Sequence, residues 1–363
     1  MRIVLTHQTV VNHDAIGNDI EVMCKFLSQK HDCMVYAQNC LNKSLKYIDE
    51  ESFYKLLNDQ NAVIIYHHSV FWEEGEAFLH KTRGKIVIRY HNITPPEFFA
   101  PYDSHSYSQC KLGREQTMRF AEEFPDAFWL VDSEFNSLDV SNVNKERLVV
   151  FPPLNKTEEW AKGLPDENLL SDLINSSDIN LLFIGRVAPN KGHMFLLDVM
   201  NAYCTNYDTG IKLRIIGRFY DELSDYNDTI KQRIVDYHIE DNVEFIGEIN
   251  DALLSSYYLG SDFFICASEH EGFCVPIVES QFFGLPVIAR YKGAVPETVG
   301  MNQITLREDP YDYAAAIRLI YENSDYYCFL RNNGMDNYQS RFSMDILYSH
   351  FANIFENNLG VPV

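Results

Sequence analysis

One stretch of the sequence indicates both a local structure and a kind of chemistry, and it runs Ser268-Glu269-His270-Glu271-Gly272-Phe273-Cys274-Val275-Pro276-Ile277-Val278-Glu279-Ser280. Residues 262–266 before it form a short apolar run with little polar interruption, which is typical of a buried strand. We expect a short helix over residues 275–283, because Pro276 suits the first turn of a helix. Glu271 and Glu279 therefore flank a strand-to-helix turn, and ligands of doubly wound sheets bind at such turns.

The same alternation of strand and helix runs through the rest of the chain. Strands are expected at residues 2–5, 33–36, 62–66, 85–90, 127–131, 148–151, 180–184, 212–216, 243–246, 262–266 and 286–289. Strands that alternate with helices indicate parallel sheets covered on both faces. The sequence therefore predicts an α/β protein with two Rossmann-like, doubly wound domains.

The length of 363 residues exceeds what one typical core needs and supports two domains. Pro152 and Pro153 stop regular structure, and a polar stretch at 155–180 follows them. An apolar stripe of Leu347, Phe351, Ile354 and Phe355 predicts a closing helix. We therefore expect domains at 1–155 and 156–341, with a helix in 342–363 that packs back on the first domain.

Composition excludes several classes of function. The net charge of −22 argues against a nucleic-acid partner. No apolar run approaches a membrane span, and the first residues enter a strand without a signal-peptide pattern. None of the eight cysteines forms a Cys-x-x-Cys pair or alternates with histidine at zinc-like spacing. These observations predict a cytoplasmic protein with reduced cysteines, and peripheral association with the inner face of the membrane stays open.

A local basic cluster departs from the acidic average of the chain. It comprises Lys81, Arg83, Lys85 and Arg89. A solvated turn entering a strand and a membrane-facing patch are both compatible with it.

The loop at residues 185–193 joins a predicted strand to a predicted helix. Arg186 and Lys191 would lie there beside exposed backbone amides, where they could hold a diphosphate by charge-assisted hydrogen bonds. The spacing is not that of a Walker loop. Solvated surface side chains are the alternative for this pair, and the two glutamates at the same predicted sheet edge favour binding.

These residues resemble a known family, the retaining glycosyltransferases of family four. The resemblance rests on Gly185-Arg186-x-x-x-x-Lys191-Gly192, followed by Glu271 and, eight residues later, Glu279. It spans nearly the whole chain and is densest from 181 to 297. It implies the two-domain GT-B fold, in which an acceptor-binding first domain and a nucleotide-sugar-binding second domain face a cleft.

The resemblance also implies roles for the glutamates. Glu271 would lie by the donor sugar as a catalytic and sugar-binding residue, and Glu279 would bind the ribose hydroxyls. A carboxylate can accept two hydrogen bonds from a vicinal diol, which agrees with the second role. The alternative for Glu279 is a first-turn charge that favours the helix dipole. The backbone amides around Gly272, Phe273 and Cys274 would meet sugar hydroxyls, although Cys274 stands where the family often has glycine.

Two residues of the first domain are further candidates. His91 follows a predicted strand, as a histidine does in the family, and the resemblance implies that its carbonyl or imidazole stabilises the oxocarbenium-like charge at the donor sugar. A structural histidine is the alternative. Gly17 lies in the loop at 13–18, which occupies the place of the family's glycine-rich first turn. It would let a helix N-terminus, capped by Asn18 or Asp19, approach the donor phosphate, and an ordinary turn glycine is the alternative.

A short aromatic and histidine-rich stretch gives weaker expectations. His67, His68, Phe71 and Trp72 are candidates for acceptor contact, with core packing as the default for the two aromatic residues. Metal ligation by His67 and His68 is not expected, because neither a carboxylate nor a third ligand stands at a suitable spacing.

The predicted reaction is metal-independent, retaining transfer of a sugar from a nucleoside diphosphate to a glycan or lipid-linked acceptor in polysaccharide or lipopolysaccharide assembly. Arg186 and Lys191 would replace the divalent metal, and no cofactor is expected. Residues 89–99 resemble transferases of bacterial surface polysaccharides, several of which use GDP-mannose, so this donor is favoured. A UDP-sugar donor, an epimerase or phosphorylase on the same fold, and a silent nucleotide-sugar-binding partner subunit are the alternatives.

Overall fold

The computed structural model describes residues 1–12 and 14–362, which fold as two compact units. The first unit consists of Met1–Pro96, His105–Lys156 and Ser343–Val363. The second consists of Glu97–Ser104 and Thr157–Phe342. The segment Glu97–Ser104 thus groups with the second unit, although the sequence assigns it to the first domain. Among the described residues, no helix is long and apolar enough to cross a membrane.

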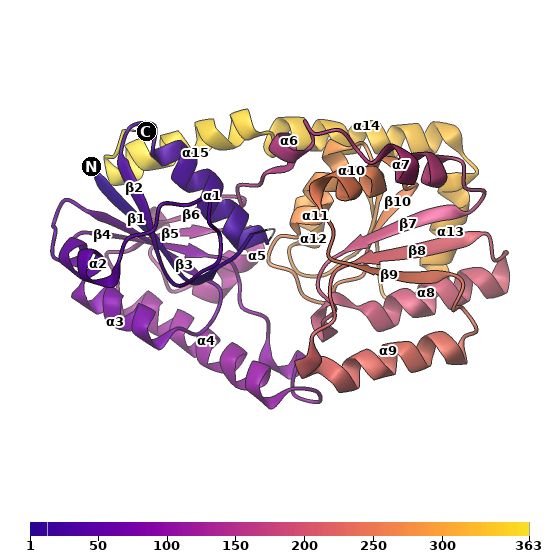
Figure 1. The fold of residues 1–363 in the computed structure, drawn as a ribbon, viewed down its shortest axis with the longest axis horizontal. Helices are drawn as coiled ribbons and strands as arrows, with labels where there is room; N and C mark the ends of the chain where they lie inside the picture. The colour runs from indigo at the N-terminus through magenta and orange to yellow at the C-terminus, as the bar shows by residue number, and fades with distance from the viewer. Residues whose placement is uncertain (13, 363) are drawn as a thin grey trace. The chain divides into compact units, whose positions relative to one another are not determined.

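The first unit is built on a parallel sheet of six strands in the order β2-β1-β3-β4-β5-β6. The strands are β1 (Arg2–Val10), β2 (Asp32–Cys40), β3 (Val63–His68), β4 (Lys85–Tyr90), β5 (Phe128–Val131) and β6 (Leu148–Val150). Its helices are α1 (Ala15–Leu27), α2 (Glu50–Leu57), α3 (Glu73–Lys81), α4 (Ser104–Glu123), α5 (Glu134–Ser137) and α15 (Met344–Leu359). Figure 1 shows both sheets with their helices.

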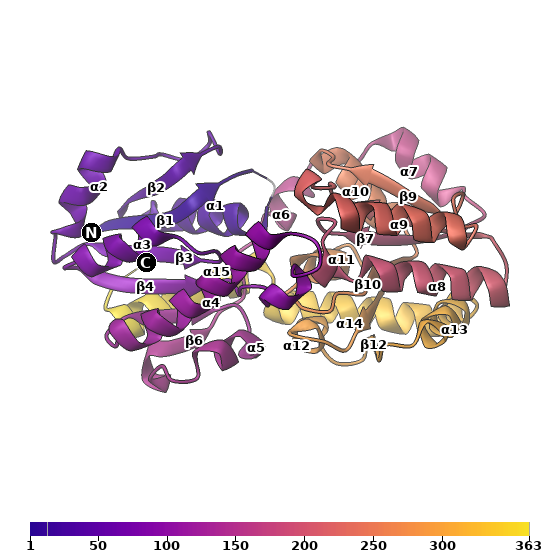
Figure 2. The same cartoon turned by 90° about the horizontal axis from the view of Figure 1, so that it is seen from below.

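Side chains that alternate along the strands supply two separate cores, one on each face of this sheet. Ile3 and Leu5 of β1 belong to the core under α1 and α15, whereas Val4 belongs to the core under α2, α3 and α4. Figure 2 shows α3 and α4 along the second of these faces. Both faces of a parallel sheet are therefore buried, which explains the continuous apolar runs in the strands.

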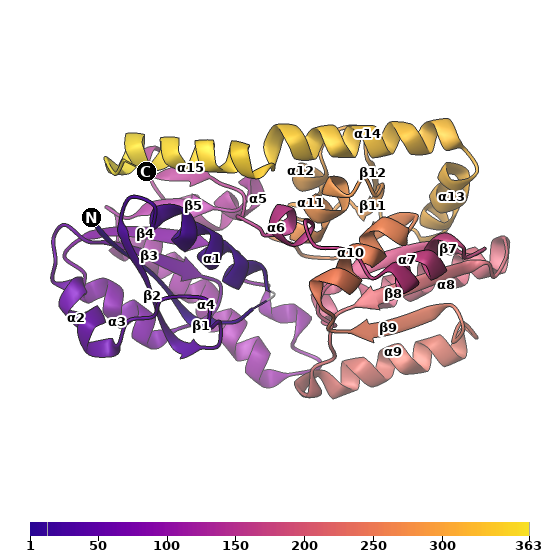
Figure 3. The ribbon, with the colours of Figure 1, turned by 45° about the horizontal axis from the view of Figure 1, so that its top comes forward.

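The closing helix α15 completes the first of these cores, although it comes from the end of the described chain. Phe351 of α15 is fully buried and packs on Phe151, with ring centroids 5.4 Å apart. Tyr348 stacks on Phe26 of α1 at 4.6 Å. The yellow α15 lies along the first unit in Figure 3.

The second unit repeats the architecture with a parallel sheet in the order β12-β11-β10-β7-β8-β9. The strands are β7 (Ile179–Ile184), β8 (Ile211–Ile216), β9 (Val243–Gly247), β10 (Phe263–Cys266), β11 (Val287–Arg290) and β12 (Ile304–Leu306). Its helices are α6 (Thr157–Trp160), α7 (Glu167–Ile174), α8 (His193–Asn206), α9 (Ser224–Asp236), α10 (Asp251–Gly260), α11 (Val275–Phe282), α12 (Val295–Val299), α13 (Pro310–Tyr321) and α14 (Ser324–Arg341). In Figure 1, α8 and α9 lie on one face of this sheet and α7 and α10 on the other.

The two doubly wound sheets confirm the predicted fold class. The expected strands are present, with shifts of a few residues at their ends, and the helix expected at 275–283 is α11. The sequence did not indicate strand β12 or the helices α3, α4, α5, α6, α7, α12 and α14, and α6 and α7 lie in the stretch at 155–180 that was expected only to separate the domains. Glycine and polar residues interrupt the apolar face of α4, and of its twenty residues four are buried. Tertiary packing therefore stabilises a helix such as α4 without an apolar stripe that the sequence could reveal.

Candidate functional site

The order of strands in the second sheet places two loops next to each other at its carboxyl edge. Strand β7 pairs with both β8 and β10, and the chain reaches β10 after it has built β8 and β9 on the other side of β7. The gap between the loops that follow β7 and β10 is thus a topological switch point, where ligands of open α/β sheets bind. These loops are 185–192 and 267–274, which carry the two motifs singled out in the sequence.

An ion pair joins the two loops at this point. Lys191 Nζ lies 2.7 Å from Glu271 Oε1, and the same oxygen accepts a hydrogen bond of 2.7 Å from Ser268 Oγ. The side chain of Glu271 is 10% exposed and that of Lys191 is 19% exposed. The structure therefore brings the predicted phosphate-binding lysine and the predicted sugar-binding glutamate into direct contact.

Glycines permit the close approach of these loops. Gly192 has a left-handed φ of 72°, and a Cβ there would lie 2.1 Å from the carbonyl oxygen of Ala267. Gly293 has a φ of 57°, and its Cβ would lie 2.7 Å from the carbonyl oxygen of Glu271. Any side chain at either position would push the loops apart. The position of Glu271 thus depends on the backbone of two other loops.

Helix α11 begins directly after a residue in a conformation that side chains rarely adopt. Its N-cap, Cys274, has φ 74° and ψ 72°, and the helix has proline in its first turn. A glycine would adopt this conformation without cost, so a cysteine here stores strain of about 1 kcal/mol. The neighbouring Phe273 is buried against Phe342, with ring centroids 5.6 Å apart. Gly272 and Cys274 are half-buried, so this turn lies at the edge of the core.

The second glutamate has a different environment from the first. Glu279 is half-buried in α11, and its Oε2 accepts a hydrogen bond of 2.6 Å from the hydroxyl of Tyr258 in α10. Burial raises the pKa of Glu279 to about 7, although the Tyr258 hydrogen bond acts in the opposite direction. The alternative of a first-turn charge on α11 does not describe this side chain, since it points to a neighbouring helix and is held there.

Arg186 and the loop around it complete the candidate site of the second unit. Arg186 is exposed in the loop after β7, and Lys191 ends the short 3-10 helix η4 (Pro189–Lys191). Asn190 in that helix accepts a backbone hydrogen bond of 2.9 Å from the amide of Glu269 and donates one of 3.3 Å from its side chain to the carbonyl of His270. The loop after β7 is therefore fastened to the loop after β10 by backbone contacts as well as by charge.

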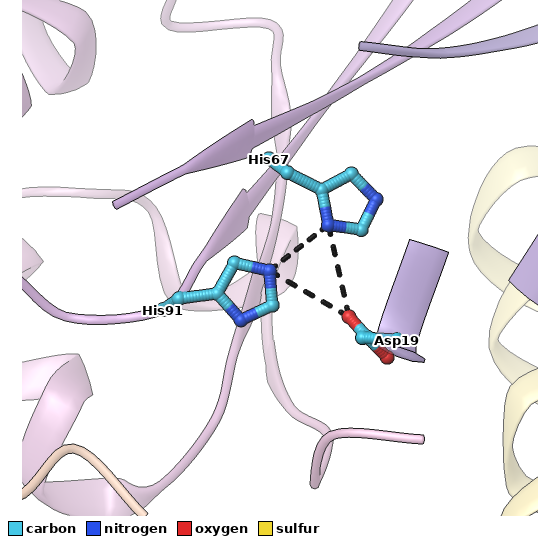
Figure 4. Close-up of side chains that lie close together, drawn as sticks. All are labelled: Asp19, His67 and His91. Carbon is cyan, nitrogen blue, oxygen red and sulfur yellow. Dashed lines mark hydrogen bonds and ion pairs between the residues drawn. The ribbon is translucent and has the colours of Figure 1, made fainter. Parts of the chain in front are cut away.

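His91 lies at the carboxyl edge of the first sheet and is surrounded by polar side chains. Its Nε2 lies 2.9 Å from Nδ1 of His67 and 3.6 Å from Oδ2 of Asp19, as Figure 4 shows. Its Nδ1 lies 3.2 Å from Oδ2 of Asp132. The side chain of His91 is 5% exposed. Both ring nitrogens therefore have partners within the protein.

Arg89 is buried beneath this cluster and does not belong to a basic surface patch. Its Nε donates to Oδ2 of Asp19 at 3.0 Å, and its Nη2 lies 2.9 Å from Oδ1 of Asp132. Arg89 alternates with the apolar residues of β4 and is fully buried. The predicted cluster of four basic residues is wrong for Arg89, because the arginine pairs with two buried aspartates in the core.

The first turn of α1 also differs from the prediction. The helix starts at Ala15 and is capped by Asp14, whose side chain accepts a hydrogen bond from the amide of Gly17. The prediction that Asn18 or Asp19 caps it is wrong, since Asp19 is buried and paired with Arg89. A Cβ at Gly17 would lie 2.1 Å from the carbonyl oxygen of Val11, so close packing requires glycine. His13, where the predicted loop begins, lies outside the described residues.

The argument against a metal ligand fails for His67 but not for His68. Ligand atoms of Asp19, His67 and His91 lie within 4.8 Å of one another, so a carboxylate and a third ligand are close to His67. Nε2 of His68 instead faces the Thr117 hydroxyl at 2.8 Å. Because Arg89 already donates to the same oxygen of Asp19, a positive charge stands where it would oppose a cation.

The structure adds Tyr258, Ser268, Gly293 and Asp132, which the sequence did not single out as site residues. It also adds Asp19 and Arg89, to which the sequence gave other roles, a helix cap and a basic surface cluster. Ser268 and Asp132 follow buried strands almost directly, so their position at a carboxyl edge was a usable signal. Tyr258 gave none, because its contact with Glu279 depends on how α10 packs on α11. Trp72 is buried, as expected for a core residue.

Sequence comparison finds one family model and several relatives. Residues 167–336 match the model of the glycosyl transferases group 1. The chain is 22% identical over 294 residues to the capsular polysaccharide biosynthesis glycosyltransferase CapH of Staphylococcus aureus. This alignment covers 78% of this chain and 76% of CapH. The chain is 27% identical over 134 residues to the mannosylfructose-phosphate synthase of Agrobacterium fabrum, which covers 36% of this chain and 30% of that protein.

A third relative is the GDP-mannose:cellobiosyl-diphosphopolyprenol alpha-mannosyltransferase of Xanthomonas campestris. It is 31% identical over 110 residues, which cover 30% of this chain and 28% of the relative. This chain therefore aligns with less than a third of two of the three relatives, and with about three quarters of CapH.

Comparison with solved structures covers the whole fold. The structure of Alr3699/HepE from Anabaena in complex with UDP and glucose superposes with a TM-score of 0.79 at 15% identity, over 98% of this chain and 100% of that chain. At this identity the likeness concerns the fold. Residues 167–336 therefore carry a domain of the glycosyl transferases group 1 type, and the chain as a whole has the GT-B fold.

Proposed function

We propose that this protein transfers a sugar, with retention of anomeric configuration, from a nucleoside diphosphate to a hydroxyl of a glycan or lipid-linked acceptor during polysaccharide or lipopolysaccharide assembly. The observation that carries the proposal is the contact between Lys191 and Glu271 at the switch point of the second sheet. The name of CapH, a capsular polysaccharide glycosyltransferase, supports the assignment to polysaccharide assembly.

Donor binding would exchange the partners of this ion pair. Lys191 would turn from Glu271 to the diphosphate, and the exposed guanidinium of Arg186 would add a second positive charge. Glu271, still held by Ser268, would then accept hydrogen bonds from the donor sugar. The amides of residues 272–274 would complete the sugar contacts, and Glu279 would accept hydrogen bonds from the two ribose hydroxyls.

In the proposed step, the acceptor oxygen forms a bond to the anomeric carbon on the same face of the sugar from which the diphosphate oxygen departs as its bond to that carbon breaks, so the configuration is retained. The acceptor hydroxyl gives its proton to the departing diphosphate, which leaves as a nucleoside diphosphate. Arg186 and Lys191 would stabilise the negative charge that develops on the leaving group. His91 would stabilise the positive charge that develops on the sugar.

Two donors have support. GDP-mannose is favoured because the Xanthomonas relative is named as a GDP-mannose-dependent mannosyltransferase and the Agrobacterium relative as a mannosylfructose-phosphate synthase. A UDP-sugar is the second candidate, because the chain superposes on Alr3699/HepE over its full length and that structure contains UDP. A silent nucleotide-sugar-binding subunit would keep the binding residues without the reaction.

The first prediction concerns the ion pair. Lys191→Ala and Glu271→Ala should each lower the transfer rate by at least about 100-fold, since each removes a group that contacts the reacting donor. Lys212→Ala is the matched control, because Lys212 is half-buried on β8, as Lys191 is in its loop, and donates to the carbonyl of Asp241. Transfer of radiolabelled sugar measures the rates, and circular dichroism checks folding. Near-normal rates in both folded variants would refute the proposed site.

The second prediction concerns the pH dependence of nucleotide binding. Burial raises the pKa of Glu279 to about 7, so in the ligand-free protein the carboxylate form becomes dominant above pH 7. Only the carboxylate accepts both ribose hydroxyls, and affinity for the correct nucleoside diphosphate should therefore rise up to about tenfold between pH 6 and pH 8. Isothermal calorimetry at each pH measures this affinity. Glu279→Gln should remove this rise, and an equal rise in the variant would exclude Glu279 from the ribose site.

The third prediction concerns metal. Since Arg186 and Lys191 supply the positive charge for the leaving group, EDTA should leave the rate of sugar transfer unchanged. A rate that falls with EDTA and returns with Mg²⁺ or Mn²⁺ would contradict metal-independent transfer.

The fourth prediction distinguishes the donors. A nucleotide that binds the native state raises its melting temperature. In a thermal-shift screen of GDP, UDP and ADP, GDP should give the largest shift, and GDP-mannose should be turned over. A larger shift with UDP would show that the donor is a UDP-sugar and not GDP-mannose. A shift without turnover of any donor, with a range of glycan acceptors, would favour the silent subunit.

A further inference from the structure

The turn that carries His91 is held from two sides by carboxylates of one short segment. Asp132 follows β5 directly and contacts the ring of His91. Asp139, seven residues later, accepts a hydrogen bond of 2.7 Å from the hydroxyl of Tyr90, the residue before His91. Asp139 also pairs with Arg114 at 2.8 Å, and Arg114 donates to the carbonyl of Ile93 at 2.8 Å.

The backbone of this turn is in a rare conformation. Asn92, directly after His91, has a left-handed φ of 68°, and its side chain donates to Oδ1 of Asn136 at 3.0 Å. Conformations of this kind persist where the surrounding contacts outweigh their cost, and they cluster at functional sites. The contacts of Asn92 and Ile93 supply that compensation here, so the turn after β4 is fixed on both sides of His91.

Donor and acceptor accounting assigns the proton positions in the neutral rings. A carboxylate only accepts, so the His91 Nδ1 that faces Asp132 must donate. Nε2 of His91 is then the acceptor, and Nδ1 of His67 donates to it across 2.9 Å. Asp132 thus determines the tautomer of His91, as a carboxylate behind a histidine does in other enzymes.

Arg89 keeps Asp132 in this role. The arginine lies between Asp132 and Asp19, and its Nη1 donates to the carbonyl of Phe151 at 2.7 Å. The other oxygen of Asp19 accepts a hydrogen bond of 2.8 Å from the amide of Leu154. Burial alone would lower the pKa of Arg89, but the two aspartates raise it overall, so the guanidinium stays charged. Each carboxylate therefore has a fixed orientation.

We propose that Asp132, fixed by Arg89, is a positioning residue that sets the tautomer and orientation of the His91 imidazole for sugar transfer. This proposal rests on the proposed function, in which His91 acts at the donor sugar. It assigns an effect on the rate of sugar transfer to a buried ion-pair network in the core of the first unit.

Asp132→Asn isolates this effect with almost no change in volume. One oxygen of Asp132 faces the guanidinium of Arg89 at 2.9 Å, and the other faces the ring of His91 at 3.2 Å. An asparagine has one oxygen, so its NH₂ group must point at one of these two donors. Either Arg89 loses its partner or the ring of His91 must change its tautomer or move away.

We expect Asp132→Asn to lower kcat by about 100-fold, because displacement of a reacting group by about 1 Å costs this much. KM for the nucleotide-sugar and calorimetric affinity for the nucleoside diphosphate should stay within about twofold. Glu76→Gln is the matched control. It removes a carboxylate from another ion pair of the first unit, in which Glu76 lies 2.8 Å from Arg119, and it should leave kcat unchanged.

A double-mutant cycle with His91→Ala separates positioning from general destabilisation. If Asp132 acts through His91, Asp132→Asn should cause no further loss in kcat once His91 is alanine. Equal, multiplicative losses in both backgrounds would overturn the proposal. If His91→Ala alone keeps full activity, the proposed role of His91 fails. The positioning of the ring is then decided by the nitrogen NMR shifts of His91, which should report a changed tautomer in Asp132→Asn.

Metal analysis of the purified protein provides an independent check. Asp19, His67 and His91 could hold a cation, whereas the proposal requires a hydrogen bond between the two rings. Protein without bound transition metal, and an unchanged rate after addition of Zn²⁺, supports the hydrogen-bonded network. One equivalent of metal that is lost in His67→Ala would overturn it, since His91 would then be oriented by the metal.

Discussion

The ion pair between Lys191 and Glu271 depends on parallel strands in one sheet having their carboxyl ends at one edge. The two residues are 80 positions apart in the chain, and the pairing of β7 with β10 brings their loops together. Gly192 then allows the backbone of one loop to touch that of the other. Both charges are mostly withdrawn from water, so their attraction is stronger than at an exposed surface, and an anionic ligand must compete with Glu271 for the lysine.

The carboxyl edges of the two sheets use charge in different ways. In the first unit, Arg89 is fully buried between two aspartates, and removing one partner of such a pair typically costs about 3–5 kcal/mol. Because the arginine pairs with both carboxylates inside the protein, that arrangement suits the fixing of geometry. In the second unit, Arg186 is exposed and Lys191 is partly exposed, so cationic donors remain accessible there. In the proposed mechanism, the first edge fixes the position of His91, and the cations of the second edge pair with the anionic donor.

The sequence was sufficient for the fold class and for most strands, because buried parallel strands produce apolar runs that local patterns reveal. It also singled out Lys191 and Glu271, which lie in contact. The sequence-based predictions failed for residues whose role depends on neighbours that are distant in the chain. Arg89 stands beside Lys81, Arg83 and Lys85 in the chain, yet strand alternation turns it into the core. Asp19 looked like a cap for α1, and only the buried partner Arg89 distinguishes it from one. The pKa of Glu279 depends on packing between α10 and α11, which no local pattern encodes.

The first unit is discontinuous along the chain, since α15 joins a core otherwise made from residues before 157. Its apolar face cannot be covered until a segment that follows the entire second unit has returned to it. Contacts between such distant segments close slowly, because the intervening chain must be ordered or looped out first. A fragment ending after β6 would leave Phe26 and Phe151 in water, so recombination between related proteins by a single cut between the units would separate this helix from its core.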